Sequence, residues 1–510
     1  MTPSNGANDF CLAIDLGTTS LKVAVVGSDG SIAALASRPL TTRFVNAGVE
    51  QDANQWWAHL VSGVHEVLAV GTVTPSRIRL ITCTAQYMSL VPVAADGCPV
   101  GPVLMWMDDR GASSLAHLRS RDMRSLWREH HGLAPFGSDD LAHLSFLQAE
   151  MPQVYDAAVS LVEPVDALTA RLVGFVSANQ NTAFPLLLTD NRTLGTVTYD
   201  DELVGLAGVD PAKLASLVPI GAILGTLCRP AAQALGLAPH TQVVSGTIDS
   251  VTSAIGTAAI AENRCGLVIG TTSVVVAHAR TKRIDPVRSL FTAPSGLPGR
   301  YVLLAENGVG GKAIEQVGAL LSLDPAALLG AAANSPPGSN GVRFLPWLVG
   351  SMAPQPNPHA RGGFLGLSLS TTTSDLCRAA VEGVALNVAG LLPEVESFLG
   401  DQYSSLTFGG GGASSPLWAQ VLADACQRPV ARVSKPRATN ARGAALLAFA
   451  HAGLIPFEHL GDRVPLAEIH YPDRGLGDLY AAARNSLRAA LDQLPPSPPS
   501  PVLPSMNQTP

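Results

Sequence analysis

A short turn motif occurs twice in the chain, and this repeat constrains the fold more than any other feature. Residues 15–25 read DLGTTSLKVAV and residues 268–278 read VIGTTSVVVAH. In both copies a Gly-Thr-Thr-Ser turn separates two apolar segments that have the pattern of β-strands. The shared strand context favours a duplicated domain over a chance match of four small residues. The sequence therefore predicts two similar domains of roughly 240 residues each in a chain of 510 residues.

The residues around the first turn alternate between strand and helix patterns. Residues 11–16, 21–27 and 31–38 are predicted as three consecutive strands, and residues 54–70 have the period of an amphipathic helix. The apolar face of that helix is predicted to hold Trp57, Val61, Val64 and Leu68. Alternation of this kind is typical of α/β sheets. Apolar residues make up 47% of the chain and aromatic residues only 5%, so we expect aliphatic cores.

The charge balance and the cysteines exclude several classes of protein. The chain has 33 Lys and Arg against 40 Asp and Glu, a net charge of -7, without a concentrated basic patch. We therefore expect no nucleic-acid partner. The seven cysteines form no CxxC pair, which argues against a disulfide framework or a zinc site. Because neither a signal-peptide pattern nor an uncharged apolar run of ~18 residues is present, we expect a cytoplasmic protein without membrane association.

The two ends of the chain differ in composition from the rest. Residues 1–9 are mostly polar, and seven of the last sixteen residues are proline. We expect residues 1–9 to be a disordered N-terminus and residues 494–510 to be a disordered Pro/Ser-rich tail. Between them we expect one domain over residues 10–256 and a second over residues 257–493.

Both Gly-Thr-Thr-Ser turns have the chemistry of a phosphate-binding loop. Glycine allows close approach of an anion, and the threonines supply hydroxyl and amide donors. Lys22 adds a positive charge, and Asp15, at the end of the preceding strand, suits Mg²⁺. One such turn alone is more often an ordinary hairpin, but two copies and an adjacent aspartate favour phosphate. The predicted nucleotide-binding residues are Gly17, Thr18, Thr19, Lys22, Gly270, Thr271 and Thr272.

A third glycine cluster, residues 409–412, precedes a predicted helix with Ser415 as its N-cap. A glycine loop between a strand and a helix N-terminus allows a nucleotide to approach the backbone. Gly410, Gly411 and Ser415 are therefore candidate nucleotide-binding residues, with an ordinary tight turn as the alternative. The loop lacks the spacing GxxxxGK[ST], which excludes a P-loop NTPase.

Eight segments along residues 10–455 occur in the order found in a known family. They are AIDLGTTSLKVAVVGSDGSI, VEQDANQWW, LMWMDDRG, VVSGTIDSVTSAIG, VIGTTS, NPHARGGFLGLSLSTTTSDLCRAAVEG, FGGGGASSPLWAQVLADACQRPV and TNARGAALLA. Together they resemble the motifs of the FGGY carbohydrate kinases, the group that contains xylulokinase and glycerol kinase. The resemblance implies an α/β fold of two duplicated ribonuclease H-like domains, of the actin-like ATPase type, with an interdomain cleft.

The resemblance also implies a reaction and its main residues. The chain would be a carbohydrate kinase that uses ATP and Mg²⁺ to phosphorylate a hydroxyl of a small sugar or polyol, most closely a ketopentose. Asp249 would be the catalytic base, Asp15 a second catalytic residue and the Mg²⁺ ligand, and Gly310 a further nucleotide-binding residue. Asp249 precedes a predicted small-residue helix, whose dipole favours an ionised carboxylate. The alternative is that Asp249 is the N-cap of that helix.

The sugar half of the chain departs from the family pattern. The implied substrate-binding residues are Gln86, Tyr87, Met88, Trp106, Asp108, Arg110 and Asp249. For Asp108 and Arg110 the alternative is a solvated charged turn, and for Trp106 a core position. Tyr87-Met88 stands where family members commonly have Met-His or Arg-Glu, His143 where a lysine is usual, and Asn179–Asn181 where an acid is expected. The departures gather in the sugar half, so we expect them to affect the substrate more than the reaction.

Other functions remain open at this point. The chain is either such a ketopentose kinase, a kinase for glycerol or a sugar acid, or a non-catalytic sugar or nucleotide sensor that keeps the fold. The presence of both Asp15 and Asp249 argues against a sensor. An ATPase of the chaperone or filament type is disfavoured by the family signature within residues 362–382. A homodimer is possible.

Overall fold

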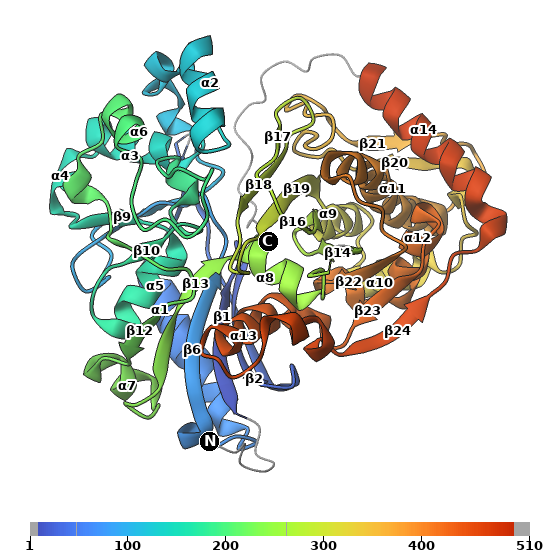
Figure 1. Cartoon of the computed structure of the whole chain (residues 1–510). Helices are drawn as coiled ribbons and strands as arrows, with labels where there is room; N and C mark the ends of the chain where they lie inside the picture. Colours follow the sequence, from blue (N-terminus) through green and yellow to red (C-terminus); the bar gives the residue numbers. More distant parts are fainter. Residues whose placement is uncertain (1–8, 47, 262, 494–510) are drawn as a thin grey trace.

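The computed structural model describes residues 9–46, 48–261 and 263–493. Of the segments expected to be disordered, residues 494–510 and all of 1–9 except Asp9 lie outside this part of the chain. The described residues form two main β-sheets, with helices packed against each (Figure 1).

The first sheet has the strand order β12-β13-β6-β1-β2-β3. In it β1 pairs antiparallel with β2 and parallel with β6, and β6 pairs parallel with β13. The edge strands β3 and β12 pair antiparallel with β2 and β13. The bounds are β1 (Phe10–Leu16), β2 (Ser20–Gly27), β3 (Ile32–Pro39), β6 (Ile78–Ala85), β12 (Ile223–Thr226) and β13 (Gln242–Ile248).

The second sheet repeats this pairing pattern in the order β17-β18-β19-β15-β14-β22-β23-β24. Here β14 pairs antiparallel with β15 and parallel with β22, which pairs parallel with β23. The matching partners around the two Gly-Thr-Thr turns confirm the predicted duplicated α/β fold. The bounds are β14 (Arg264–Ile269), β15 (Thr272–Val276), β16 (His278–Ala279), β17 (Ile284–Asp285), β18 (Leu290–Pro294), β19 (Tyr301–Val309), β22 (Ser405–Gly409), β23 (Val430–Val433) and β24 (Leu466–His470).

The three predicted strands correspond to β1, β2 and β3, and the predicted helix to α1 (Ala53–Ala69). Of its predicted apolar face Val64 is fully buried, whereas Trp57, Val61 and Leu68 are only half-buried at the edge of the core. The buried face of α1 includes Trp56, Leu60 and Val64, and Trp56 Nε1 donates to Gln51 Oε1 at 2.9 Å. Trp57 instead lies against the Arg171 guanidinium, 4.3 Å from the ring centroid. Two adjacent tryptophans create two apolar stripes of equal period, and only packing decides which one faces the sheet.

Short elements inserted between β6 and β13 form a separate packed layer, at the upper left of Figure 1. Its helices are α2 (Arg121–His130), α3 (Asp140–Glu150), α4 (Pro152–Ala157) and α6 (Asp201–Ala207). Its strands are β7 (Val91–Val93), β9 (Ser160–Val162), β10 (Ala178–Asn179) and β11 (Leu217–Val218). A small sheet of β4 (Arg43–Val45), β5 (Gly48–Gln51) and β8 (Val103–Leu104) joins this layer to the first sheet. This layer carries most of the residues predicted to bind sugar.

Helices of the second half pack around α11 (Thr373–Leu399), which begins with a capping box between Thr372 and Asp375. Among the described helices α11 is long and apolar enough to cross a membrane, but 78% of its most apolar window is buried in the protein. It is therefore placed as a core helix. The other helices and strands here are α9 (Gly311–Leu320), α10 (Pro325–Ala332), α12 (Pro416–Cys426), α14 (Gly477–Gln493), β20 (Arg343–Leu345) and β21 (Gly363–Leu365).

Two helices, α8 (Asp249–Gly256) and α13 (Thr439–His451), cross between the sheets near the centre of Figure 1. A Cβ atom on Gly443 would overlap the carbonyl of Thr252, and one on Gly256 would overlap the carbonyl of Thr439. Ser253 Oγ donates to Asn440 Oδ1 at 2.8 Å across the same contact. The backbones thus touch directly, and α13 also packs on β1 and β6 while α1 (with α5, Pro164–Val173, and α7, Arg229–Leu235) covers the opposite side.

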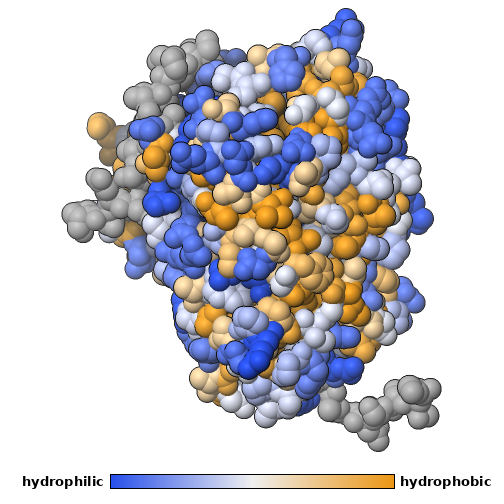
Figure 2. All heavy atoms as spheres, turned by 90° about the vertical axis from the view of Figure 1, so that its left-hand side faces the viewer, coloured by the Kyte–Doolittle hydropathy of each residue, from blue (hydrophilic) through white to orange (hydrophobic). Residues whose placement is uncertain are grey.

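The face shown in Figure 2, the left-hand side of Figure 1, carries apolar patches among polar residues. Exposed large apolar residues of the first half include Phe136, Val159, Phe175 and Ile223. Apolar surface of this kind occurs at protein contacts as well as on monomers. The possible homodimer stays a prediction.

We expect the substitution Gly443→Ala to lower the melting temperature of the protein. The added methyl group forces α8 and α13 apart, and overpacking of this kind typically costs about 1–3 kcal/mol. The matched control is Gly330→Ala in α10, where an added Cβ meets open space. Alanine is a better helix former than glycine, so the control is expected to melt at or slightly above the wild type. A Gly443→Ala protein that melts no lower than the control would contradict the close helix contact.

Candidate functional site

The first Gly-Thr-Thr turn connects β1 to residues from several other elements. Thr18 Oγ1 donates to Gln86 Oε1 at 2.6 Å and accepts from Trp106 Nε1 at 3.1 Å. The Thr18 carbonyl accepts from Gln51 Nε2 at 2.8 Å. The Thr18 hydroxyl therefore holds two residues predicted for the sugar pocket, while Gly17 is half-buried and Thr19 is exposed. The phosphate role of this turn stays a prediction.

Asp15 and Lys22 form an ion pair at the end of β1. They are register partners on the two antiparallel strands, and Lys22 Nζ lies 3.0 Å from Asp15 Oδ2. The Asp15 side chain is almost fully buried. The ion pair with an ammonium group offsets the cost of burying this carboxylate, and carboxylate oxygens are ligands that Mg²⁺ takes in proteins. Among the described residues no three His, Cys, Asp or Glu side chains gather into a metal site, and the Mg²⁺ role of Asp15 stays a prediction.

Asp249 is the first residue of α8 and follows β13 directly. Burial, followed by the negative charges of Asp15 and Glu306, raises the pKa of Asp249 to about 7. The helix dipole was expected to keep the Asp249 carboxylate ionised. That expectation is wrong, because burial and two neighbouring carboxylates raise the pKa of Asp249 by more than one helix end lowers it. The alternative of an N-cap is also wrong, since Ile248 occupies the N-cap position.

Glu306 on β19 is a residue of this site that sequence reasoning missed. Burial raises its pKa to about 7, and Glu306 pairs in register with Val274 of β15, the strand that begins at Thr272 in the second turn. Because Asp249 feels the charges of both Asp15 and Glu306, these acids connect the first turn to the second. One signal was available, an acid within the apolar strand YVLLAENGV.

Tyr87 brings the predicted sugar segment to Asp249. Burial, followed by the charges of Glu306 and Asp249, raises the pKa of its phenol, so the Tyr87 side chain lies near both acids. The adjacent Gln86 side chain is buried, and its Nε2 has no partner among the described residues. An unpaired buried amide beside the acids is suited to a hydroxyl of a bound molecule.

The second turn lies against the start of α9 and the third glycine cluster. The carbonyl of Thr271 accepts from the Gly310 amide at 2.9 Å, and that of Gly270 accepts from Gly311 at 2.8 Å. A Cβ atom on Gly410 would lie 2.6 Å from the carbonyl of Ile269, so only glycine fits there. Ser415 Oγ accepts from the Trp418 amide at 3.3 Å, which confirms it as the N-cap of α12. The structure thus brings Gly270, Gly310 and Gly410 together.

The space around Gly270 and Gly411 is open. A Cβ atom on Gly270 or on Gly411 would meet nothing within 4 Å, and Gly270, Thr271 and Gly411 are exposed. Exposed backbone at the second turn and at the glycine cluster of residues 409–412 lies near the first residues of α9, α12 and α13. Exposed backbone amides and helix N-termini are the groups that bind anions in proteins. Nucleotide binding by these residues, including Thr272 and Ser415, stays a prediction.

Asp108 and Arg110 are engaged with each other and with β5. Asp108 Oδ2 accepts from the Val49 amide at 2.9 Å and lies 2.6 Å from the Arg110 guanidinium, which also bonds Glu50 at 2.9 Å. Asp108 is fully buried, so the alternative of a solvated charged turn is wrong for it. These contacts hold the segment in place, and direct sugar binding by Asp108 and Arg110 stays a prediction.

Asn179 and Asn181 fix the strand that leads to Asp249. Asn179 Nδ2 donates to Ser245 Oγ at 2.8 Å and to the Gly246 carbonyl at 2.9 Å. Asn181 Oδ1 accepts from the Ile248 amide at 2.9 Å, and its Nδ2 donates to the Pro294 carbonyl at 2.7 Å. These amides, which stand where the family usually has an acid, therefore position β13 against both halves of the chain.

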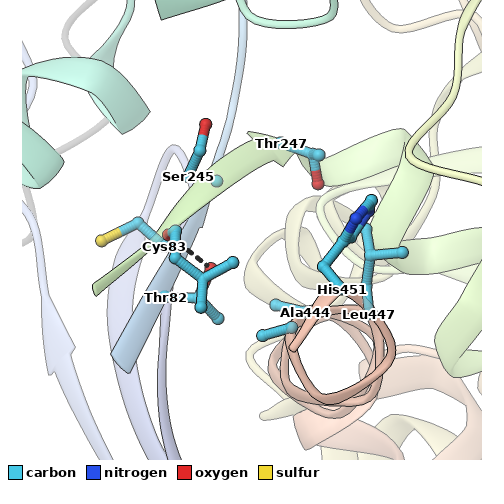
Figure 3. Close-up of a pocket in the computed structure, with 10 residues that line it drawn as sticks. Thr82, Cys83, Ser245, Thr247, Ala444, Leu447 and His451 are labelled. Atoms are coloured by element: carbon cyan, nitrogen blue, oxygen red, sulfur yellow. Dashed lines mark hydrogen bonds between the residues drawn. The ribbon is translucent and has the colours of Figure 1, made fainter. Parts of the chain in front are cut away.

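A small cavity lies between β6, β13 and α13 (Figure 3). Its lining includes Thr82, Ser245, Thr247, Leu447 and His451. The cavity volume of about 10 Å³ is enough for a single water molecule. It is therefore no candidate for a sugar site.

We expect Asp108→Asn to destabilise the protein in the absence of any ligand. The substitution leaves Arg110 without its closest carboxylate, and breaking a buried pair typically costs about 3–5 kcal/mol. The matched control is Asp109→Asn at the neighbouring exposed residue, which should melt like the wild type. If Asp108→Asn leaves the melting temperature unchanged and alters only sugar binding, the segment-holding role is refuted.

Comparison with known proteins agrees with this geometry. Residues 10–256 match the N-terminal domain of the FGGY family of carbohydrate kinases, and residues 265–452 match its C-terminal domain. The chain is 26% identical to the xylulose kinase of Escherichia coli (strain K12), over 95% of this chain and 99% of that protein. It is 28% identical to the glycerol kinase of Citrifermentans bemidjiense, over 88% of this chain and 91% of that protein.

A solved structure shows the same fold. The gluconate kinase of Lactobacillus acidophilus superposes with a TM-score of 0.82, covering 95% of this chain and 98% of that one at 20% identity. The two matched domains account for most of the chain, and their motifs lie where the acids and glycine turns converge. The chain therefore belongs to the FGGY family of carbohydrate kinases, phosphotransferases with an alcohol group as acceptor.

Proposed function

We propose that this protein transfers the γ-phosphoryl group of ATP to a hydroxyl of a ketopentose, as a xylulokinase does. The observation that carries the proposal is the pair of hydrogen bonds that Thr18 Oγ1 forms with Gln86 and Trp106, because they support a sugar pocket next to the first turn. Relatives named xylulose kinase recur among those that cover most of the chain, at 24–29% identity. Relatives named glycerol kinase and gluconokinase define the competing acceptors.

Asp249 is the proposed general base. Its carboxylate accepts the proton of the acceptor hydroxyl while the hydroxyl oxygen bonds to the γ-phosphorus and the bond to ADP breaks. A base whose pKa lies near the working pH combines a useful ionised fraction with real affinity for the proton. Burial, followed by the charges of Asp15 and Glu306, supports this role, because it raises the pKa of Asp249 to about 7 from a value at which it would be a weak base.

The nucleotide would lie along the two glycine turns. Lys22 supplies a positive charge, and the exposed backbone of Gly270, Thr271 and Gly411 faces the open space where phosphates fit. Asp15 is the residue that would hold Mg²⁺. When bound with ATP, that ion neutralises the charge that develops on the phosphates. Closure of the two halves over the sugar would exclude water and suppress ATP hydrolysis.

The substrate proposal is tested by an ADP-release screen. Ketopentoses, polyols including glycerol, and sugar acids including gluconate are offered with ATP and Mg²⁺, and D-xylulose is expected to give the highest kcat/KM. The Asp249→Asn protein serves as the control for contaminating kinases. Preference for glycerol or gluconate would refute the ketopentose assignment alone, whereas no release with any acceptor would favour the sensor alternative.

We expect Asp249→Asn to lower kcat by about 10²- to 10⁴-fold, the usual contribution of general-base catalysis. Asparagine fills the same space without accepting a proton. The melting temperature is expected to stay equal or rise, because the substitution removes a carboxylate that lies near Asp15 and Glu306. Steady-state kinetics with melting curves decide the matter. A near-normal kcat would reopen the search for the base.

The pH dependence follows from the pKa of about 7 for Asp249. The base works only when ionised, so kcat/KM for the sugar should rise from pH 5.5 and level off about one unit above the pKa. Glu306→Gln removes one of the charges that raise this pKa, and should therefore shift the rise to lower pH. An unchanged midpoint in Glu306→Gln would show that Glu306 does not face the base.

A further inference from the structure

Three buried titratable residues lie behind the sugar segment and have no part in the chemistry described above. Glu163 precedes α5, Asp140 begins α3, and His143 is one turn further along α3. All three are almost completely buried. Buried charged groups are costly to retain unless they are paired, so their contacts identify what they do.

Glu163 holds the main chain at Met88. Its Oε1 accepts from the Met88 amide at 2.8 Å. Met88 has a φ of 60°, in the left-handed region that side chains other than glycine rarely adopt. A conformation of this kind persists only where neighbouring groups fix it. The Glu163 carboxyl group is such a neighbour, one residue after Tyr87.

The second carboxyl oxygens of Glu163 and Asp140 are both left without a partner. Glu163 Oε2 and Asp140 Oδ2 are buried and have no hydrogen-bond partner among the described residues, and the charge of Asp140 acts on Glu163. Ionised carboxylates can only accept, so a hydrogen bond between two of them requires one shared proton. Burial and the charge of Asp140 correspondingly raise the pKa of Glu163.

His143 contacts both Asp140 and the second predicted sugar segment, which contains Asp108. Its Nδ1 lies 3.3 Å from Asp140 Oδ1, and its Nε2 lies 2.9 Å from the carbonyl of Asp108. A carbonyl only accepts, so Nε2 carries a proton, and Nδ1 is the ring nitrogen next to the Asp140 carboxyl group. Although burial opposes it, the bond to Asp140 raises the pKa of His143, which favours the imidazolium form.

The elements packed around Glu163, Asp140 and His143 contribute further charged and titratable groups. Asp166 on α5 acts on Glu163, and Asp108 and Asp139 act on His143. Asp139 accepts hydrogen bonds from three backbone amides, and Asp108 is paired with Arg110. Loss of a proton between Glu163 and Asp140 would therefore add a second negative charge beside Asp140, whose other side-chain contact is His143.

We propose that Glu163, Asp140 and His143 form a proton-sharing chain of positioning residues that sets the distance between Met88 and Asp108, and thereby the affinity for the acceptor sugar. The proposal rests on the proposed function, because Met88 and Asp108 belong to the predicted sugar segments. These three residues leave the nucleotide turns untouched. Their effect is therefore on the sugar KM and not on the ATP KM.

The kinetic test compares Glu163→Leu with Glu163→Gln, using D-xylulose or whichever acceptor the screen identifies. Leucine leaves the Met88 amide without an acceptor, so the sugar KM should rise by about tenfold or more while the ATP KM changes by less than about twofold. Glutamine accepts from Met88 and donates to Asp140, as a protonated glutamate does, and should restore most of the sugar affinity. Glu150→Gln, at the exposed end of α3, is the matched control.

The sign of the pH effect follows from the shared proton. In the wild type the sugar KM should rise when alkaline pH removes the proton from the Glu163–Asp140 pair, whereas Glu163→Gln cannot lose it and should keep a flat sugar KM. Asp249 is already ionised in this range and affects both proteins alike. An equal rise in both proteins would refute the shared proton.

A spectroscopic readout separates this proposal from the kinase assignment. The infrared spectrum at pH 8.5 should contain a protonated-carboxyl C=O band that is lost in Glu163→Gln and kept in Glu150→Gln. An unchanged band refutes proton sharing, and a lost band with an unaltered sugar KM in Glu163→Leu refutes the positioning role. If Glu163→Leu fails to fold, Glu163→Gln still decides through its band and pH profile. If the wild type turns over no acceptor, the proposed function fails, and the sugar-induced shift in melting temperature replaces KM in the comparison.

Discussion

The direct backbone contact between α8 and α13 determines the geometry of the whole molecule. Gly256 and Gly443 allow each helix to lie against a carbonyl group of the other, at the point where the first sheet meets the second. Because α8 begins with Asp249 and α13 packs on β1, the contact also fixes the distance between Asp249 and the end of β1, where Asp15 lies. Thr439, the first residue of α13, additionally accepts from the Gly410 amide. One helix crossing therefore sets the relation of the acids to the glycine loop.

Around that helix crossing the site places three acidic side chains near one another, although their like charges repel. Asp15 comes from β1, Asp249 from α8 and Glu306 from β19, and Lys22 is the positive charge that opposes them. Like charges in a buried site raise one another's pKa, which produces a carboxyl group that titrates near neutrality. The arrangement is expensive for folding and useful for proton transfer. Active sites commonly show this conflict between stability and function.

The two halves of the site are built differently. The predicted nucleotide side consists of exposed backbone at glycine turns, where an added Cβ on Gly270 or Gly411 would meet open space. The sugar side consists of buried polar side chains that bond each other, including Asn179 and Asn181 behind β13. Buried polar networks of this kind fix one arrangement because each unpaired member is costly. Departures from the family pattern are accordingly concentrated on the sugar side.

The sequence by itself determined the duplicated fold, the two turns and the reaction class, because strand periodicity and ordered short motifs are local properties of the chain. It also identified Asp15 and Asp249 as the acids of the site. It could not choose between Trp56 and Trp57 for the buried face of α1, because both fit the same period. Nor could it find Glu306, or the contacts of Glu163 with Met88 and of His143 with Asp108, since these partners are far apart in the chain and meet only through packing. The tertiary structure alone decided the electrostatics of Asp249, because burial and neighbouring charge depend on distances that no sequence window contains.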